Sequence, residues 1–180
     1  WKELCFLIMM QSSAHQKELL SLRTEKLNFS GAFPYIEISR TLEDNKIVDT
    51  VKTDSRERII PIVYNLERIE ELIAELQDGR YVFGSTREKE SSNLNNQLNN
   101  TLKSLLPPDS HGKVTTYGFR HSFKERCNRA NINPQLTYML GGWSGLNSIA
   151  EGYGSAADYA EELFLASQAI NRALIEKRVN

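Results

Sequence analysis

The sequence has little cysteine and no long apolar run. Cys5 and Cys127 are its two cysteines, too few for a disulfide framework, and no Cys/His cluster has the spacing of a zinc site. We therefore expect two reduced thiols in a cytosolic protein, with neither a metal nor a cofactor. No apolar stretch is long enough to span a bilayer and no signal peptide is visible, so we expect no membrane association.

A strong excess of one charge is also missing. The chain has 22 Lys and Arg residues against 23 Asp and Glu residues, a net charge of −1 and a pI near 6.4. Binding to nucleic acid would therefore need a local basic patch. The segment 111–134 offers one, because Glu125 is its one acidic residue among five cations: Lys113, Arg120, Lys124, Arg126 and Arg129. Such a patch is either an anion-binding surface or a solvated helix face.

Length and composition suit a single folded unit. With 180 residues, of which 40% are hydrophobic and 25% charged, the chain can form one globular domain with a substantial core. We expect this domain to span 1–180, because no internal repeat or long linker divides the sequence. The chain begins with Trp1 instead of methionine, so we expect it to be a fragment of a longer protein.

Most of the sequence has helical periodicity. Ser13-x-x-Gln16 matches a capping box and predicts a helix from about Ala14 to Leu22. Apolar residues recur at helical spacing in five later segments: 66–76, 91–106, 119–130, 134–141 and 156–175.

Between the first two helices, three segments predict a small antiparallel sheet. They are 34–38, 47–51 and 58–62, and Pro61 can lie only at the edge or the end of its strand. The sequence therefore predicts an α+β fold that is mainly α-helical, with a three-stranded antiparallel sheet.

Three segments carry an ordered set of motifs. The first, 12–22, has His15 three residues before Glu18; the second is Tyr-Gly-Phe-Arg-His-Ser-Phe at 117–123. The third is Gly-Gly-Trp-Ser at 141–144, where Trp143 lies 23 positions after Arg120 (143 − 120). In order and spacing these segments resemble the motifs of the tyrosine recombinases, the phage-integrase family. The resemblance implies the fold of that family's C-terminal catalytic domain.

Arg120 matches the arginine of the second motif, which holds the scissile phosphate. A guanidinium stays charged and presents a planar fork to two phosphate oxygens. Tyr117 stands where the family usually has a histidine that assists proton transfer; a phenol can donate a hydrogen bond but is a poor base at neutral pH. A plain packing role for Tyr117 is the alternative. We expect Lys113, His121 and Lys124 to contact DNA.

Trp143 and Tyr153 match the third motif and the nucleophile. The indole of Trp143 could donate to a phosphate oxygen or pack against the helix of the nucleophile. Tyr153 lies ten positions after Trp143 (153 − 143), one more than is common. Its phenol oxygen would attack phosphorus and form a 3′-phosphotyrosyl link. Tyr159 and Tyr138 are the alternative nucleophiles, and a packing role is the other interpretation of Tyr153.

Two more positions complete the resemblance. Lys52, at the loop of the predicted hairpin, matches a strand-borne lysine that protonates the leaving 5′-oxygen, although exposed hairpin lysines are often merely solvated. His15 stands where the first arginine belongs, and an imidazole lacks the forked pair of donors. We expect a loss of rate, because a charge-stabilising donor contributes ~2.7–4 kcal/mol to catalysis.

The resemblance implies site-specific DNA recombination or integration by a mobile element, in the cytoplasm of a bacterial host. It implies a clamp on double-stranded DNA that an N-terminal core-binding domain completes, and a homo-tetramer on DNA that forms from monomers. Two alternatives stay open: a catalytically inactive DNA-binding remnant, which His15 and Tyr117 favour, and a topoisomerase or telomere-resolving relative. The segment after Tyr153 docks on a neighbouring subunit or packs in cis.

Overall fold

The computed structural model describes residues 1–43, 46–49, 57–84, 91–111, 113–143 and 156–176. The longer helices are α1 (Lys2–Gln11), α3 (Leu66–Leu76), α4 (Ser91–Ser104), α5 (Gly118–Arg129), α6 (Pro134–Gly141) and α7 (Ala160–Ile170), and the short ones are α2 (Gln16–Leu20) and α8 (Arg172–Glu176). The strands are β1 (Leu27–Asn28), β2 (Tyr35–Ile38), β3 (Thr41–Glu43), β4 (Lys46–Asp49) and β5 (Arg58–Pro61). The prediction of a mainly helical α+β fold with a three-stranded antiparallel sheet is confirmed.

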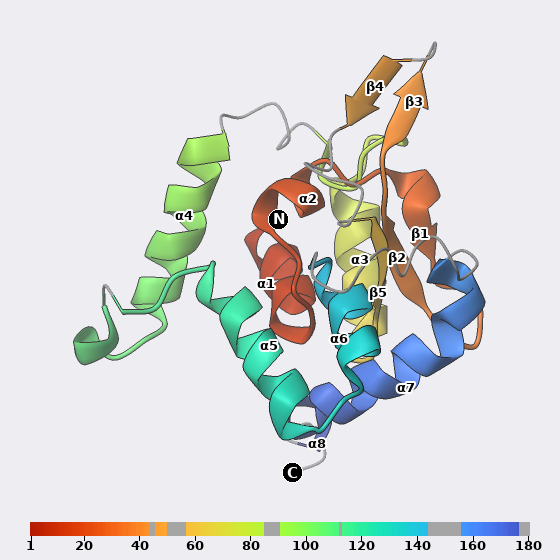
Figure 1. Cartoon of the computed structure of the whole chain (residues 1–180). Helices are drawn as coiled ribbons and strands as arrows, with labels where there is room; N and C mark the ends of the chain where they lie inside the picture. The colour runs from red at the N-terminus through yellow and green to blue at the C-terminus, as the bar shows by residue number, and fades with distance from the viewer. Residues whose placement is uncertain (44–45, 50–56, 85–90, 112, 144–155, 177–180) are drawn as a thin grey trace.

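The membership of the sheet differs from the prediction. Its order is β1-β2-β5, whereas the predicted strand at 47–51 is β4, which pairs with β3 in a separate hairpin that projects from the body (Figure 1). Neighbouring strands joined by a short connection pair with each other first, so β4 takes β3 as its partner. β1, with two residues, is too short for a periodic signal. Pro61 is the last residue of an edge strand, as predicted.

Strand β5 lies between two apolar cores, and successive residues face opposite sides of it. Ile60 belongs to the first core with Ile36 of β2, and Ile59 belongs to the second core with Phe123. This alternation is the period of two that a pleated strand imposes. Helices therefore cover both faces of the sheet.

Helix α1 is the centre of the first core. Leu4, Cys5, Ile8 and Met9 are buried there, and α1 packs against α3 and α5. Because α1 carries apolar residues around most of its circumference, it lacks the polar face by which an amphipathic helix is recognised in a sequence. Both cysteines are buried and free, and burial raises the pKa of the Cys5 thiol to about 12.

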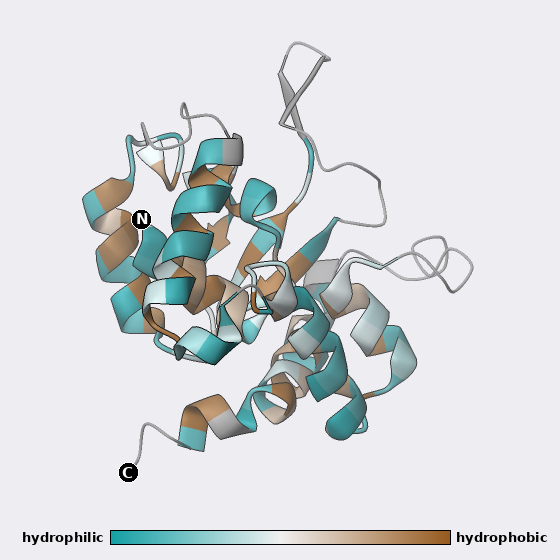
Figure 2. Ribbon diagram, turned by 90° about the vertical axis from the view of Figure 1, so that its left-hand side faces the viewer, coloured by the Kyte–Doolittle hydropathy of each residue, from teal (hydrophilic) through white to brown (hydrophobic). Residues whose placement is uncertain are grey.

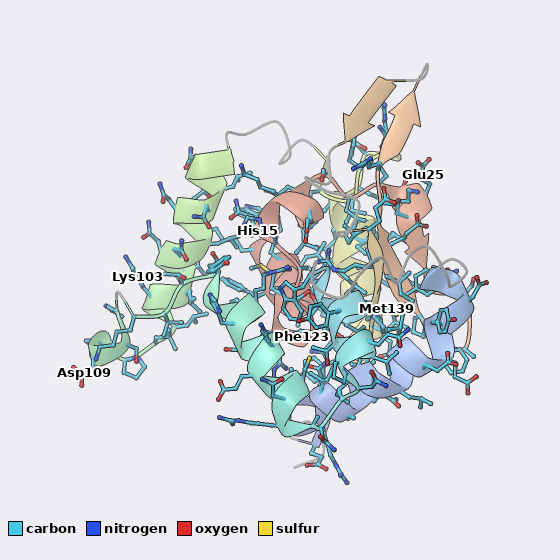
Figure 3. The ribbon with its side chains drawn as sticks, viewed as in Figure 1. His15, Glu25, Lys103, Asp109, Phe123 and Met139 are labelled. Atoms are coloured by element: carbon cyan, nitrogen blue, oxygen red, sulfur yellow. The ribbon has the colours of Figure 1, made fainter. Side chains whose placement is uncertain are left out.

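The second core joins α5, α6 and α7. Its buried residues include Phe123 on α5, Leu140 on α6 and Leu163 on α7. Figure 3 shows Phe123 between α5 and α6, and Met139 on the side of α6 away from α5. The described segment after 155 therefore packs in cis, which was one of the two expectations for it.

The predicted helix over 156–175 is interrupted at Asn171. The Asn171 side chain donates to Gln11 O at 2.9 Å and accepts from Nη1 of Arg126 at 2.5 Å. These tertiary bonds tie the end of α7 to α1 and α5, and they have no signal in the local sequence.

The Asn-rich tract forms helix α4, as its leucine spacing predicted. Leu94, Leu98 and Leu102 are buried, and the opposite face carries polar side chains. Figure 2 shows hydrophobic and hydrophilic residues alternating along the helices, as expected where one face of a helix is buried. Within the described ranges no helix is long and apolar enough to cross a membrane.

Candidate active site

Arg120 is the residue at which the three motif segments meet. It is the third residue of α5, where the apolar positions Phe119 and Phe123 fix the helix against the cores. Its Nη1 donates to Ser13 O at 2.9 Å, and its Nη2 donates to Gly142 O at 3.3 Å. The guanidinium carbon lies 5.0 Å from the centre of the Trp143 ring. The geometry therefore brings the first, second and third motifs to one guanidinium.

Trp143 follows the left-handed turn that ends α6. Gly142 adopts φ +58° there, and a side chain at Gly141 would overlap the Trp143 ring. Two successive glycines thus permit both the turn and the close approach of the indole. Lys124 lies 5.6 Å above the same ring, so two cations face it.

His15, and not Ser13, caps helix α2, which corrects the prediction from the sequence. Nδ1 of His15 accepts from Lys17 N at 3.3 Å, and His15 N donates to the Glu18 carboxylate at 2.8 Å. The hydroxyl of Ser13 instead donates to Leu140 O at 2.9 Å. The capping pattern places the cap two residues too early, at Ser13, because the partner of Ser13 on α6 cannot be inferred from the local sequence.

The cap determines the protonation state of His15 that this geometry favours. As an acceptor, Nδ1 carries no proton, so the neutral ring carries its proton on Nε2. An imidazolium would lose the bond to Lys17 N and would lie at the positive end of a helix. His15 therefore does not reproduce the permanent charge of an arginine.

A buried ion pair between Glu18 and Arg58 is the part of this region that the sequence did not reveal. Arg58 Nη2 lies 2.8 Å from Glu18 Oε2, Nη1 lies 3.3 Å from Oε1, and the two side chains are 2% and 6% exposed. Burial would raise the pKa of the Glu18 carboxyl, but Arg58, the His15 N–H and the charge of Arg120 together lower it. The pair is therefore ionised. The feature of the sequence that could have indicated this ion pair is a charged residue, Arg58, at the start of the buried strand 58–61.

A cleft of about 490 Å³ opens beside Arg120. It is lined by side chains and backbone of α1, α2, α4 and the start of α5: Met9, Ala14, His15, Gln16, Lys17, Asn95, Asn99, Thr115, Thr116, Tyr117 and Arg120. Figure 3 shows His15 on the side of α2 that faces α4. The lining residues in the described part of the chain include no carboxylate, so the cleft has the charge and the donors to hold an anion.

Two asparagines of α4 tie that helix to the edge of the cleft. Asn99 Oδ1 accepts from Thr116 N at 2.9 Å, and Asn95 Oδ1 accepts from the Thr116 hydroxyl at 3.0 Å. Thr116 itself is buried. Helix α4 therefore fixes the backbone that leads into Tyr117 and Arg120.

Tyr117 is 55% exposed at the N-terminus of α5, and its ring meets His121 edge-on, with the centroids 4.8 Å apart. Tyr117 is therefore not part of either core, and its ring contact among the described residues is with His121. Lys113, His121 and Lys124 are all exposed. Arg126, which we counted in the basic patch, turns away from it and donates to Met10 O at 2.6 Å.

Two of the predicted site residues, Lys52 and Tyr153, lie outside the described residues. Of the alternative nucleophiles, Tyr159 packs against the second core and Tyr138 is half-buried on α6. In the part of the chain that the structure describes, no group of three or more His, Cys, Asp and Glu side chains is placed to hold a metal.

The described residues have the fold of a tyrosine recombinase catalytic domain. Among solved structures, the chain is similar to that of the Tn1549 transposon integrase in complex with transposon right-end DNA, with a TM-score of 0.55 and 20% sequence identity. The match covers 88% of this chain and 57% of that one, so the chain spans little more than half of the integrase fragment. No protein-family model and no curated protein matches the sequence.

Proposed function

We propose that this chain is the catalytic domain of a tyrosine recombinase, which cleaves and rejoins DNA through a 3′-phosphotyrosyl intermediate. One observation carries the proposal: Arg120 bridges Ser13 O and Gly142 O, stacks on Trp143 and lines a cleft whose described lining residues include no carboxylate. A rigidly held guanidinium beside an anion-binding cleft suits a scissile phosphate. The solved structure with the same fold is an integrase bound to DNA.

In this proposal each predicted residue has one task. The oxygen of Tyr153 attacks phosphorus and releases its proton to solvent, the P–O bond to the 5′-oxygen breaks, and Lys52 donates a proton to that leaving oxygen. Arg120 and the indole N–H of Trp143 stabilise the charge that grows on the phosphorane oxygens. Tyr117 donates a hydrogen bond where the family uses histidine. The phosphotyrosyl bond conserves the energy of the broken phosphodiester, so rejoining needs no nucleotide cofactor.

His15 sets the expected level of activity. It offers one neutral donor where the family has a forked cation, and its Nδ1 is engaged in the helix cap. The backbone N–H groups at the start of α2 can still favour an anion nearby. We therefore propose a slow recombinase. The engaged imidazole also supports the second candidate, a DNA-binding remnant that occupies a recombination site without cleaving it.

The partners follow from the same proposal. Double-stranded DNA is the substrate, the domain spans 1–180, and a core-binding domain elsewhere in a longer protein completes the clamp. Exposed Lys113, His121 and Lys124 would contact the DNA backbone. Assembly would proceed from a monomer in the cytoplasm to a homo-tetramer on two DNA sites of a mobile element.

Replacement of Arg120 tests the proposal. Arg120→Ala should weaken binding to a mixed-sequence DNA duplex and reduce the slope of log Kd against log salt concentration by about one, because one phosphate contact is lost. Arg129→Ala is the matched control, since Arg129 is exposed on the same helix and pairs with Glu125. Equal effects of the two variants on the salt slope would contradict a phosphate-binding role for Arg120.

A further inference from the structure

The Glu18–Arg58 ion pair connects the segments that Arg120 bridges. Glu18 Oε2 accepts from Arg58 Nη2 and from His15 N, at 2.8 Å in each case. One carboxylate therefore holds strand β5 and the backbone that enters helix α2. That backbone includes Ser13, whose carbonyl accepts from Arg120.

Arg58 also lies directly against the turn that ends α6. A Cβ built on Gly142 would lie 2.9 Å from Nη1 of Arg58 and 3.1 Å from its Cδ. The guanidinium thus occupies the space that a side chain at 142 would need. Gly142 O is the second acceptor of Arg120, so Arg58 lies against the turn that carries this acceptor.

We propose that Arg58 is a positioning residue for phosphate binding by Arg120. With Glu18 it fixes the two carbonyls, Ser13 O and Gly142 O, at the separation that the Arg120 fork spans. The same turn places the Trp143 ring on which Arg120 stacks. The inference rests on the proposed function, because this geometry matters for activity only if Arg120 holds a phosphate.

A purely stabilising role can be separated from positioning. Apolar residues of similar volume often replace a buried ion pair without loss of stability, whereas the removal of one partner leaves an unpaired buried charge. The double variant Glu18→Met/Arg58→Met should therefore keep the fold. It removes both the carboxylate that accepts from His15 N and the guanidinium that lies against Gly142. Arg58→Lys keeps the charge but replaces the fork with a single point of contact.

The fluorescence of Trp143 provides a measurement that does not depend on activity. The chain has two tryptophans, so Trp1→Phe leaves Trp143 as the one fluorescent indole. In this background we would measure the melting temperature, iodide quenching of Trp143, and the salt slope of binding to a mixed-sequence duplex. The matched control is Glu3→Met/Arg68→Met, which removes a second forked pair that lies outside this region.

We expect the Glu18→Met/Arg58→Met variant to melt within a few degrees of its parent. Its Trp143 quenching should change about twofold and its salt slope should fall by about one, with a smaller change in Arg58→Lys and none in the control. The proposal would be overturned if the double variant is as stable as its parent and shows the same iodide quenching of Trp143 and the same salt slope. If the double variant does not fold, unchanged quenching in folded Arg58→Lys overturns it. A parent that binds no DNA refutes the proposed function, and the quenching series then still tests Arg58.

Discussion

Two forked Arg–Glu pairs occupy different surroundings in this molecule. Arg58 holds Glu18 at 2.8 and 3.3 Å, and Arg68 holds Glu3 at 2.9 and 3.0 Å. The side chains of the first pair are 2% and 6% exposed, and those of the second are 41% and 53% exposed. Water and salt screen the second pair, which therefore contributes little to stability, while the first holds two charges away from water. The N–O distances of the two pairs are therefore nearly equal, but their contributions to stability differ because their burial differs.

The electrostatics of the two carboxyls differ in the same way. At Glu3 the hydrogen bond from Arg68 is the main cause of a lowered pKa. At Glu18 the largest influence is burial, which opposes ionisation, and several donors and cations must together outweigh it. The lowered pKa of Glu18 therefore depends on its partners together, including Arg58 and His15 N.

The largest expected effect is the loss of one member of the buried pair. Glu18→Ala should lower the free energy of unfolding by about 3–5 kcal/mol, because the buried Arg58 loses its carboxylate partner. Glu3→Ala should produce no measurable change. Urea denaturation of both variants measures the contrast, and similar midpoints would show that burial does not distinguish the two pairs.

A smaller effect is expected at the glycine beside Arg58. Gly142 and Gly79 both have positive φ, +58° and +88°, but nothing lies within 4 Å of a Cβ at Gly79. Gly79→Ala should cost about 1–2 kcal/mol through backbone strain alone. Gly142→Ala should cost more, because Arg58 must also move. Thermal denaturation compares the variants. Equal losses of stability in Gly142→Ala and Gly79→Ala would mean that Arg58 moves aside without an energetic penalty.

The smallest expected effect is a dependence on pH. The pKa of Glu18 is lower in the folded protein than in the unfolded chain, so its contribution is complete above the unfolded value, about 4.3. The contribution is lost as the pH falls through the lower folded value. The difference in unfolding free energy between the parent and Glu18→Gln should therefore narrow on acidification from pH 7 to pH 3. A constant difference would contradict an ionised Glu18.

The sequence predicted those parts of the fold that local patterns encode. The leucines of α4, the apolar steps of α5, Pro134 at the start of α6 and the break at Gly142 all appear at their expected places. Each depends on spacing along a single element. Helix α1 and strand β1 could not be predicted, because the first has no polar face and the second is two residues long.

The candidate site was predictable in its parts and unpredictable in its connections. Motif order identified Arg120 and Trp143, which the fold brings together. The cap at His15 is local, because its partners Lys17 N and Glu18 lie within three positions of it. The bond of Ser13 to Leu140 O and the Glu18–Arg58 pair instead span 40 or more positions. A local pattern carries no record of such distant partners, which is why the sequence predicted Ser13 as the cap.

Covalent attachment to nicked DNA from beside the gene of this protein tests the central claim most directly. The parent, His15→Arg and Tyr153→Phe would be compared on a denaturing gel. We predict a weak protein–DNA band in the parent, a stronger one in His15→Arg and none in Tyr153→Phe, because the first change restores a phosphate-binding cation and the second removes the nucleophile. If neither the parent nor His15→Arg forms the band while both bind the DNA, the chain is a binding module and the account of it as a recombinase is contradicted.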